Sequence, residues 1–235
     1  MQDIIRKFSE LGGSFITSPE DLRKKIDGIK AFIFDWDGVF NNGQKIAGSG
    51  SPFSEVDSMG TNLLRFSHYL KTGQLPICAI ISGEKNDSAI SLSERECFHY
   101  SFFKTPHKIE ALEFICKKQN ITPSEVAYVF DDVLDLSIAK VCGLRILVRH
   151  KSNVLFENYC QKHRLADYIT ASDGNHYAVR ETCELLMGLN GNFDECISQR
   201  GDYSKTYNDY LLLRRAIKTE LYSVKDGAIQ SLSLF

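Results

Sequence analysis

The chain has 235 residues, of which 43% are hydrophobic and 25% charged, and its formal net charge is −2. This length suits one domain with a sizeable core, and the near-neutral charge gives no argument for a nucleic acid or an anionic membrane as a partner. No stretch approaches the ~20 apolar residues of a membrane span, and the N-terminus lacks the apolar region of a secretory signal. The seven cysteines form no C-x-x-C pair. We therefore expect a cytoplasmic protein with reduced thiols.

The predicted elements begin with a helical lead-in over residues 1–29. A short helix is indicated near 3–11. A second helix begins at Ser18, whose side chain can cap it, while Pro19 fits the first helical position.

Five apolar runs follow, and each predicts a buried strand. They cover residues 31–34, 77–81, 126–130, 144–148 and 168–170. Helical stretches are predicted at about 59–72, 85–95, 106–119, 134–142, 153–163 and 175–188. Strands that alternate with helices predict a doubly wound, Rossmann-like α/β fold, with a parallel sheet and helices on both faces.

Two segments fall outside this alternation. Residues 40–56 are rich in glycine and fit either a small β-hairpin flap over the end of the first strand or a plain surface loop. The pattern changes again near residue 190, so we assign residues 1–190 to the main domain and 191–235 to a C-terminal helical tail, with a helix near 205–221. The tail ends apolar, and we expect it to cover its own core, a neighbouring subunit or the mouth of the site.

Two carboxylates, Asp35 and Asp37, directly follow the first buried strand. Ligands of open α/β sheets bind at the carboxyl ends of the strands. Acids this close repel one another, and a hard cation with oxygen ligands relieves that repulsion. Gly38 then allows the chain to leave the strand sharply. Ordinary turn acids are the alternative.

A second set of acids follows the strand predicted at 126–130. Asp131 and Asp132 come directly after it, and Asp135 lies three residues later. Acids at two strand ends fit a divalent-cation site. Asp135 equally fits a cap or a loop hydrogen bond.

Two further places offer groups that bind anions. Ser82 and Gly83 follow the strand predicted at 77–81, where a hydroxyl and backbone N–H groups can bind a phosphate oxygen, although the pair fits an ordinary turn as well. Lys108 lies near a helix start, where a cation opposes the helix dipole. An anionic substrate would explain it. A solvated surface lysine is the alternative, and Lys104 is the rival candidate.

These motifs, in this order, resemble the haloacid dehalogenase-like phosphatases. The resemblance covers about residues 25–188 and consists of Asp-x-Asp-Gly-Val, a Ser at a strand end, a Lys at a helix start and an Asp-Asp pair. More narrowly, the chain resembles the capless sugar-acid phosphatases. It lacks the cap insertions of other branches, and its helix start at 108–112 and its late loop at 174–181 are similar to theirs. Phe130 departs from the family pattern, which usually has Gly before the acid pair.

The resemblance implies roles for individual residues. Asp35 would be the nucleophile that forms an aspartyl-phosphate, and Asp37 the general acid and then base. Asp35, Asp37 through its backbone carbonyl, and Asp131 would hold Mg²⁺, with Asp132 in or next to this set. The phosphate- and substrate-binding residues would be Ser82, Gly83, Lys108 and Arg180.

The function implied is Mg²⁺-dependent hydrolysis of a small-molecule phosphomonoester, a sugar-acid phosphate such as 3-deoxy-D-manno-octulosonate 8-phosphate. A homo-oligomer, with a tetramer favoured, is implied in the same way. A response-regulator-like receiver is the first alternative, but its acids come in another order and the chain is about twice too long for it. The second is a weak or inactive relative that serves as an interaction or structural subunit, for which Phe130 and the long tail are the only support.

Overall fold

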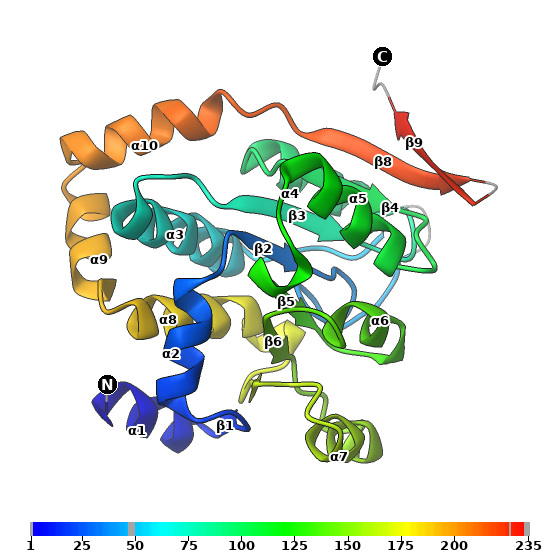
Figure 1. Cartoon of the computed structure of the whole chain (residues 1–235), viewed down its shortest axis with the longest axis horizontal. Helices are drawn as coiled ribbons and strands as arrows, with labels where there is room; N and C mark the ends of the chain where they lie inside the picture. The colour runs from blue at the N-terminus through cyan, green and yellow to red at the C-terminus, as the bar shows by residue number, and fades with distance from the viewer. Residues whose placement is uncertain (1, 47–49, 226, 233–235) are drawn as a thin grey trace.

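The computed structural model describes residues 2–46, 50–225 and 227–232. In them a nine-stranded sheet has the order β1-β7-β6-β5-β2-β3-β4-β8-β9 (Figure 1). Neighbouring strands are parallel except at the two edges, where β1–β7 and β8–β9 are antiparallel. The strands are β1 (Ser14–Phe15), β2 (Ala31–Phe34), β3 (Ile77–Ile81), β4 (Tyr100–Phe103), β5 (Val126–Phe130), β6 (Leu144–Leu147), β7 (Tyr168–Ile169), β8 (Glu220–Lys225) and β9 (Ala228–Leu232).

Helices cover both faces of this sheet (Figure 1). The α-helices are α1 (Gln2–Leu11), α2 (Pro19–Asp27), α3 (Glu55–Thr72), α4 (Asp87–Arg95), α5 (Ile109–Gln119), α6 (Leu136–Ala139), α7 (Val154–Lys162), α8 (Ala178–Asn190), α9 (Phe193–Gly201) and α10 (Lys205–Arg215). Three short 3₁₀ helices are η1 (Pro123–Glu125), η2 (Val133–Asp135) and η3 (Gly174–His176). None of the helices in the described part of the chain is both long and apolar enough to cross a membrane.

The central strand β2 shows how the two faces are buried. Phe32 and Phe34 pack into one core with α2, α3 and α8, whereas Ala31 and Ile33 pack into the other with α5, α6 and α7. Successive side chains of a strand point to opposite faces, so a strand that is apolar throughout suits a sheet covered on both sides. The predicted doubly wound α/β fold is confirmed.

The predicted flap occupies the segment between β2 and α3. An isolated antiparallel bridge joins Ile46 and Gly50, while residues 47–49 lie outside the described part. Nothing larger than this flap separates β2 from α3 in the described residues, which agrees with the expected lack of a large cap domain.

The C-terminal segment returns to the sheet. Figure 1 shows the chain passing through α9 and α10 around one end of the molecule and then entering β8. Strand β8 pairs in parallel with β4 and in antiparallel with β9, so the tail adds two strands to the sheet. Residues 233–235, the last part of the predicted apolar terminus, lie outside the described residues.

Several predicted elements are corrected by the structure. The helix predicted at 205–221 ends at Arg215, and β8 begins at Glu220. The helix predicted at 134–142 is the 3₁₀ turn η2 followed by the single turn of α6. Strand β4 and helix α9 were not predicted. At the N-terminus, Ser18 caps α2 as expected, since its side chain accepts a hydrogen bond from Asp21 N.

Candidate active site

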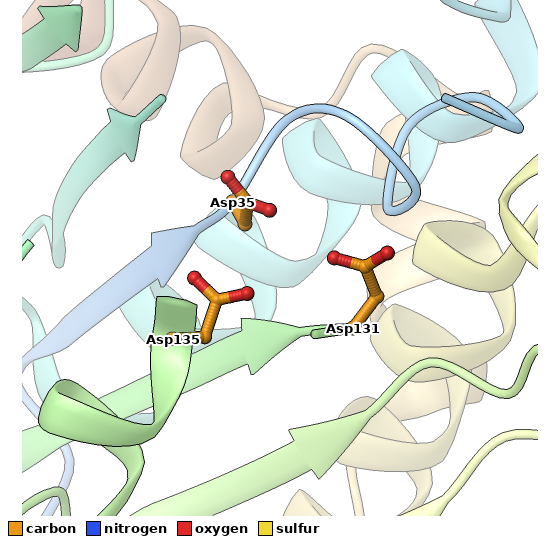
Figure 2. A group of neighbouring side chains, drawn as sticks. All are labelled: Asp35, Asp131 and Asp135. Carbon is orange, nitrogen blue, oxygen red and sulfur yellow. The ribbon is translucent and has the colours of Figure 1, made fainter. Parts of the chain in front are cut away.

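The site forms where the carboxyl ends of β2 and β5 meet. The two strands are parallel neighbours, and the backbone N–H of Asp35 still donates to Val129 of β5. Asp35 follows β2, Asp131 follows β5, and the turn η2 brings Asp135 back to the same place. One oxygen from each of the three carboxylates lies within 4.8 Å of the others, and Figure 2 shows the three side chains converging. Sheet order reverses between β2 and β5, and such switch points bind ligands in this class of fold.

Lys108 is the cation of this group. It directly precedes α5, and its Nζ lies 2.5 Å from Asp35 Oδ1 and 2.6 Å from Asp135 Oδ1. Its side chain is only 3% exposed, whereas the rival candidate Lys104 is exposed. Burial alone would lower the pKa of Lys108, but the two carboxylates outweigh burial and raise it, so the ammonium stays charged.

The acids carry more negative charge than one lysine balances. Burial, followed by the charge of Asp135, raises the pKa of Asp35 well above its usual range despite the contact with Lys108. Burial also raises the pKa of Asp131, and His150 opposes that rise by a hydrogen bond of 2.9 Å between His150 Nε2 and Asp131 Oδ2. A further cation would relieve this repulsion.

Asp135 differs from the other two acids because both of its oxygens accept hydrogen bonds from the surrounding protein. Oδ1 accepts hydrogen bonds from Lys108 Nζ and from the hydroxyl of Tyr128, and Oδ2 accepts one from the backbone N–H of Asp132. Asp135 therefore orients Lys108 and closes its own loop. The carboxylate of Asp132 is exposed and caps η2 through Val133 N, so the structure does not bring it into the acid group.

Asp37 lies two residues after Asp35 in the chain, and its side chain contacts the flap. Its side chain is 23% exposed, and Asp37 Oδ1 accepts a hydrogen bond of 2.6 Å from Ser51 Oγ. The next residue, Gly38, has φ +88°, and a Cβ built there would lie 1.9 Å from Asp131 Oδ2. Only glycine lets the loop after β2 pass so close to Asp131.

Phe130 does not disturb this arrangement. Its side chain is buried in the core and stacks on Tyr128, with ring centroids 5.8 Å apart. The residue after it, Asp131, still reaches the acid group.

The other predicted phosphate-binding residues, Ser82, Gly83 and Arg180, make no hydrogen bond or ion pair with the acid group in the described part of the chain, and their own contacts differ. Ser82 is buried at the end of β3, next to β2, and its Oγ accepts a weak hydrogen bond from Glu84 N; Gly83 follows it. Arg180 belongs to the first turn of α8. Its backbone N–H donates to Asp57, and its guanidinium pairs with Glu184 at 2.6 Å, so its contacts are not with the acid group.

Sequence reasoning missed two residues that support the acids, Tyr128 and His150. His150 lies shortly after β6, at the same edge of the sheet, which is the signal that places it near the site. Tyr128 gave no such signal, because its hydroxyl emerges from within a strand that reads as wholly apolar.

The chain is similar in sequence to known phosphatases. No family model matches the chain. It is 29% identical over 187 residues to the 3-deoxy-D-manno-octulosonate 8-phosphate phosphatase of Escherichia coli (strain K12), covering 76% of this chain and 90% of the relative. The enzyme of the same name from Salmonella typhimurium is 29% identical over 183 residues, covering 74% and 88%.

Solved structures give the same picture. A crystal structure of 3-deoxy-D-manno-octulosonate 8-phosphate phosphatase from Moraxella catarrhalis, in complex with magnesium, phosphate and KDO, matches with TM-score 0.64 and 29% identity over 77% of this chain and 98% of that one. A haloacid dehalogenase superfamily hydrolase from Legionella pneumophila matches with TM-score 0.65 and 26% identity over 78% and 95%. In sequence and in fold, the chain is similar to 3-deoxy-D-manno-octulosonate 8-phosphate phosphatases and to a hydrolase of the haloacid dehalogenase superfamily over about three quarters of its length.

Proposed function

We propose that the chain is a Mg²⁺-dependent phosphatase that hydrolyses the phosphomonoester of a small sugar acid, such as 3-deoxy-D-manno-octulosonate 8-phosphate. The observation that carries the proposal is the buried contact between Asp35 and Lys108 beside Asp131, at the switch point of the sheet. The relatives of that name support the substrate class, because they match over most of both chains.

The first half of the proposed reaction transfers the phosphoryl group to the protein. A carboxylate oxygen of Asp35 bonds to phosphorus, and the bond from phosphorus to the sugar oxygen breaks. Asp37 gives that oxygen its proton, so the alcohol leaves neutral. Lys108, which contacts Asp135, would pair with the phosphoryl oxygens, and Ser82 with Gly83 would bind them from the end of β3.

The second half releases phosphate. Asp37, now ionised, takes a proton from water while the water oxygen bonds to phosphorus, and the bond from phosphorus to Asp35 breaks. Asp35 and Asp37 then return to their starting protonation states. Positioning and charge neutralisation supply most of the rate, since phosphoryl transfer asks little covalent chemistry of a protein.

The residues present fit a magnesium ion. Mg²⁺ prefers oxygen ligands, and the buried acids lie close together with excess negative charge. On the resemblance, Asp35, Asp131 and the backbone carbonyl of Asp37 would hold it. Asp135 is the less suitable ligand, because both of its oxygens already accept hydrogen bonds from the protein. When bound, the ion neutralises charge on the transferring phosphoryl group.

Three further expectations belong to this proposal. We place the enzyme in the cytoplasm, where its seven cysteines, all unbridged, would remain reduced. We expect a homo-oligomer, with the segment 191–235 contributing contacts, on the resemblance alone. Arg180 would help to order the late loop before α8 or reach the substrate.

Light scattering of the full chain tests the expected homo-oligomer, and a monomer would contradict it.

The test of the function uses a panel of sugar phosphates that includes 3-deoxy-D-manno-octulosonate 8-phosphate, with the unmodified chain and Asp35→Asn. Phosphate release by the unmodified chain should require Mg²⁺. The variant should release no phosphate, although its circular dichroism spectrum should be unchanged. Release that persists in Asp35→Asn would rule out Asp35 as the nucleophile. No release from any substrate would favour the second hypothesis, an inactive relative that acts as an interaction subunit.

A further inference from the structure

We infer that Ser51, in the flap, is a positioning residue for Asp37 and decides which of its two carboxyl oxygens exchanges the proton. The inference rests on the proposed function, because it needs Asp37 to act as a general acid. Ser51 is fully buried, and its Oγ donates a hydrogen bond of 2.6 Å to Asp37 Oδ1. It comes from a segment 14 residues later than Asp37, on the opposite side of the flap bridge.

A hydrogen bond to one oxygen of a carboxyl group makes the two oxygens different. Because Oδ1 already accepts the proton of Ser51, the proton of a neutral Asp37 is placed on Oδ2. Oδ2 lies 3.4 Å from Lys45 Nζ, whose side chain is 50% exposed. An exposed lysine contributes little binding energy and moves aside at small cost, so it leaves Oδ2 available to a substrate.

The segment that follows Ser51 packs against the loop that carries the two acids. Pro52 follows it, and Phe53 packs edge-on against Trp36, with ring centroids 6.1 Å apart. Trp36 is the residue between Asp35 and Asp37, so the bulky side chain in this position ties the flap to the loop that carries both acids. Phe53 is also covered by the guanidinium of Arg95, 5.0 Å from the ring centroid.

The hydrogen bond has a defined place in each half of the reaction. When the sugar oxygen leaves phosphorus, it takes the proton from Asp37 Oδ2, and Ser51 continues to donate to Oδ1. When water attacks the aspartyl-phosphate, its proton goes to Oδ2. The proton of Ser51 stays on Ser51 throughout, so its role is orientation, not transfer.

The test compares two leaving groups, using kcat/KM because this constant covers only the steps through the first irreversible transfer to Asp35. An alkyl phosphate, here the sugar-acid phosphate, needs a proton on its leaving oxygen. Nitrophenyl phosphate does not, because nitrophenolate leaves as an anion. Ser51→Ala should lower kcat/KM for the alkyl ester about tenfold, part of the 10²–10⁴ that a full general acid contributes, and change the aryl ester by less than about twofold.

Two further variants complete the design. Ser51→Thr keeps the hydroxyl and should recover alkyl activity to within about threefold of the unmodified chain. Ser54→Ala is the matched control: the same change in the same segment removes the N-cap of α3, where Ser54 Oγ accepts from Val56 N. It should lower thermal stability but leave the ratio of the two kcat/KM values unchanged.

Equal losses on both esters in Ser51→Ala, or no loss on either, would overturn the inference and leave the proposed function standing. Lack of activity toward both esters in the unmodified chain would overturn the proposed function itself, and the inference with it.

Discussion

Replacing Lys108 with methionine should reveal the charge repulsion within the acid group. Methionine fills a similar volume but removes the ammonium that contacts Asp35 at 2.5 Å and Asp135 at 2.6 Å. Lys108 is 3% exposed, so little water replaces it. Breaking a buried ion pair by removing one partner costs about 3–5 kcal/mol, a large share of the ~5–15 kcal/mol that holds a domain folded. We expect the free energy of unfolding to fall by about that amount near neutral pH.

The deficit should depend on pH. The pKa values of Asp35 and Asp131 are raised in the folded chain, chiefly by burial, so the folded state binds more protons than the unfolded one. Stability from these groups is therefore present below the unfolded pKa and is lost as pH rises through the folded pKa. Without Lys108 the repulsion increases, and the deficit of Lys108→Met should be larger at about pH 8 than at about pH 5.

Urea unfolding followed by circular dichroism measures both quantities. Lys104→Met is the matched control, because Lys104 is exposed in the same loop, and surface substitutions usually change stability by less than ~0.5 kcal/mol. A deficit below about 1 kcal/mol for Lys108→Met, or one that does not change with pH, would mean that Lys108 does not offset buried negative charge in the folded chain.

Two further substitutions test other parts of the structure. Gly38→Ala places a Cβ 1.9 Å from Asp131 Oδ2, and titration calorimetry should show Mg²⁺ binding weakened at least about tenfold. The control Gly73→Ala, at φ +72° with open space around it, should lower stability by about 1–2 kcal/mol but leave Mg²⁺ binding unchanged. Equal Mg²⁺ affinities of the two variants would contradict the steric argument. Arg214→Met removes the buried ion pair of 2.8 Å between α10 and Glu96, the C-cap of α4, so urea unfolding should show a loss of about 3 kcal/mol. The exposed control Arg215→Met should be nearly neutral, and a neutral Arg214→Met would mean that this ion pair does not help to hold the tail.

The main features of the fold follow from sequence patterns because the central strands are apolar throughout. Strand β4 was missed because its four residues lie between His99 and Lys104 and include Ser101, which gives no long apolar run. Its place in the sheet is set by pairing with β3 and β8, which local sequence does not encode. The helix predicted at 205–221 was too long for the same reason, because β8, which begins at Glu220, is set by its pairing with β4.

At the site, sequence predicts which strand ends carry acids but not which acid of a cluster turns inward. Asp132 and Asp135 were both candidates, and the decision depends on η2. Asp132 caps that turn with its side chain exposed, and the turn returns Asp135 to Lys108. The three residues of η2 therefore turn Asp135 toward the site and leave Asp132 exposed, which the spacing of the acids in the sequence does not reveal.

In the proposed mechanism, Asp35 carries the phosphoryl group during turnover. Its most direct test is rapid acid quenching of the enzyme with Mg²⁺ and a sugar-acid phosphate that carries radioactive phosphorus, followed by counting the label that stays with the precipitated protein. We expect protein-bound label in the unmodified chain and none in Asp35→Asn or in the presence of a chelator. Label of equal amount in Asp35→Asn, or phosphate release by the unmodified chain with no protein-bound label at any quench time, would contradict it.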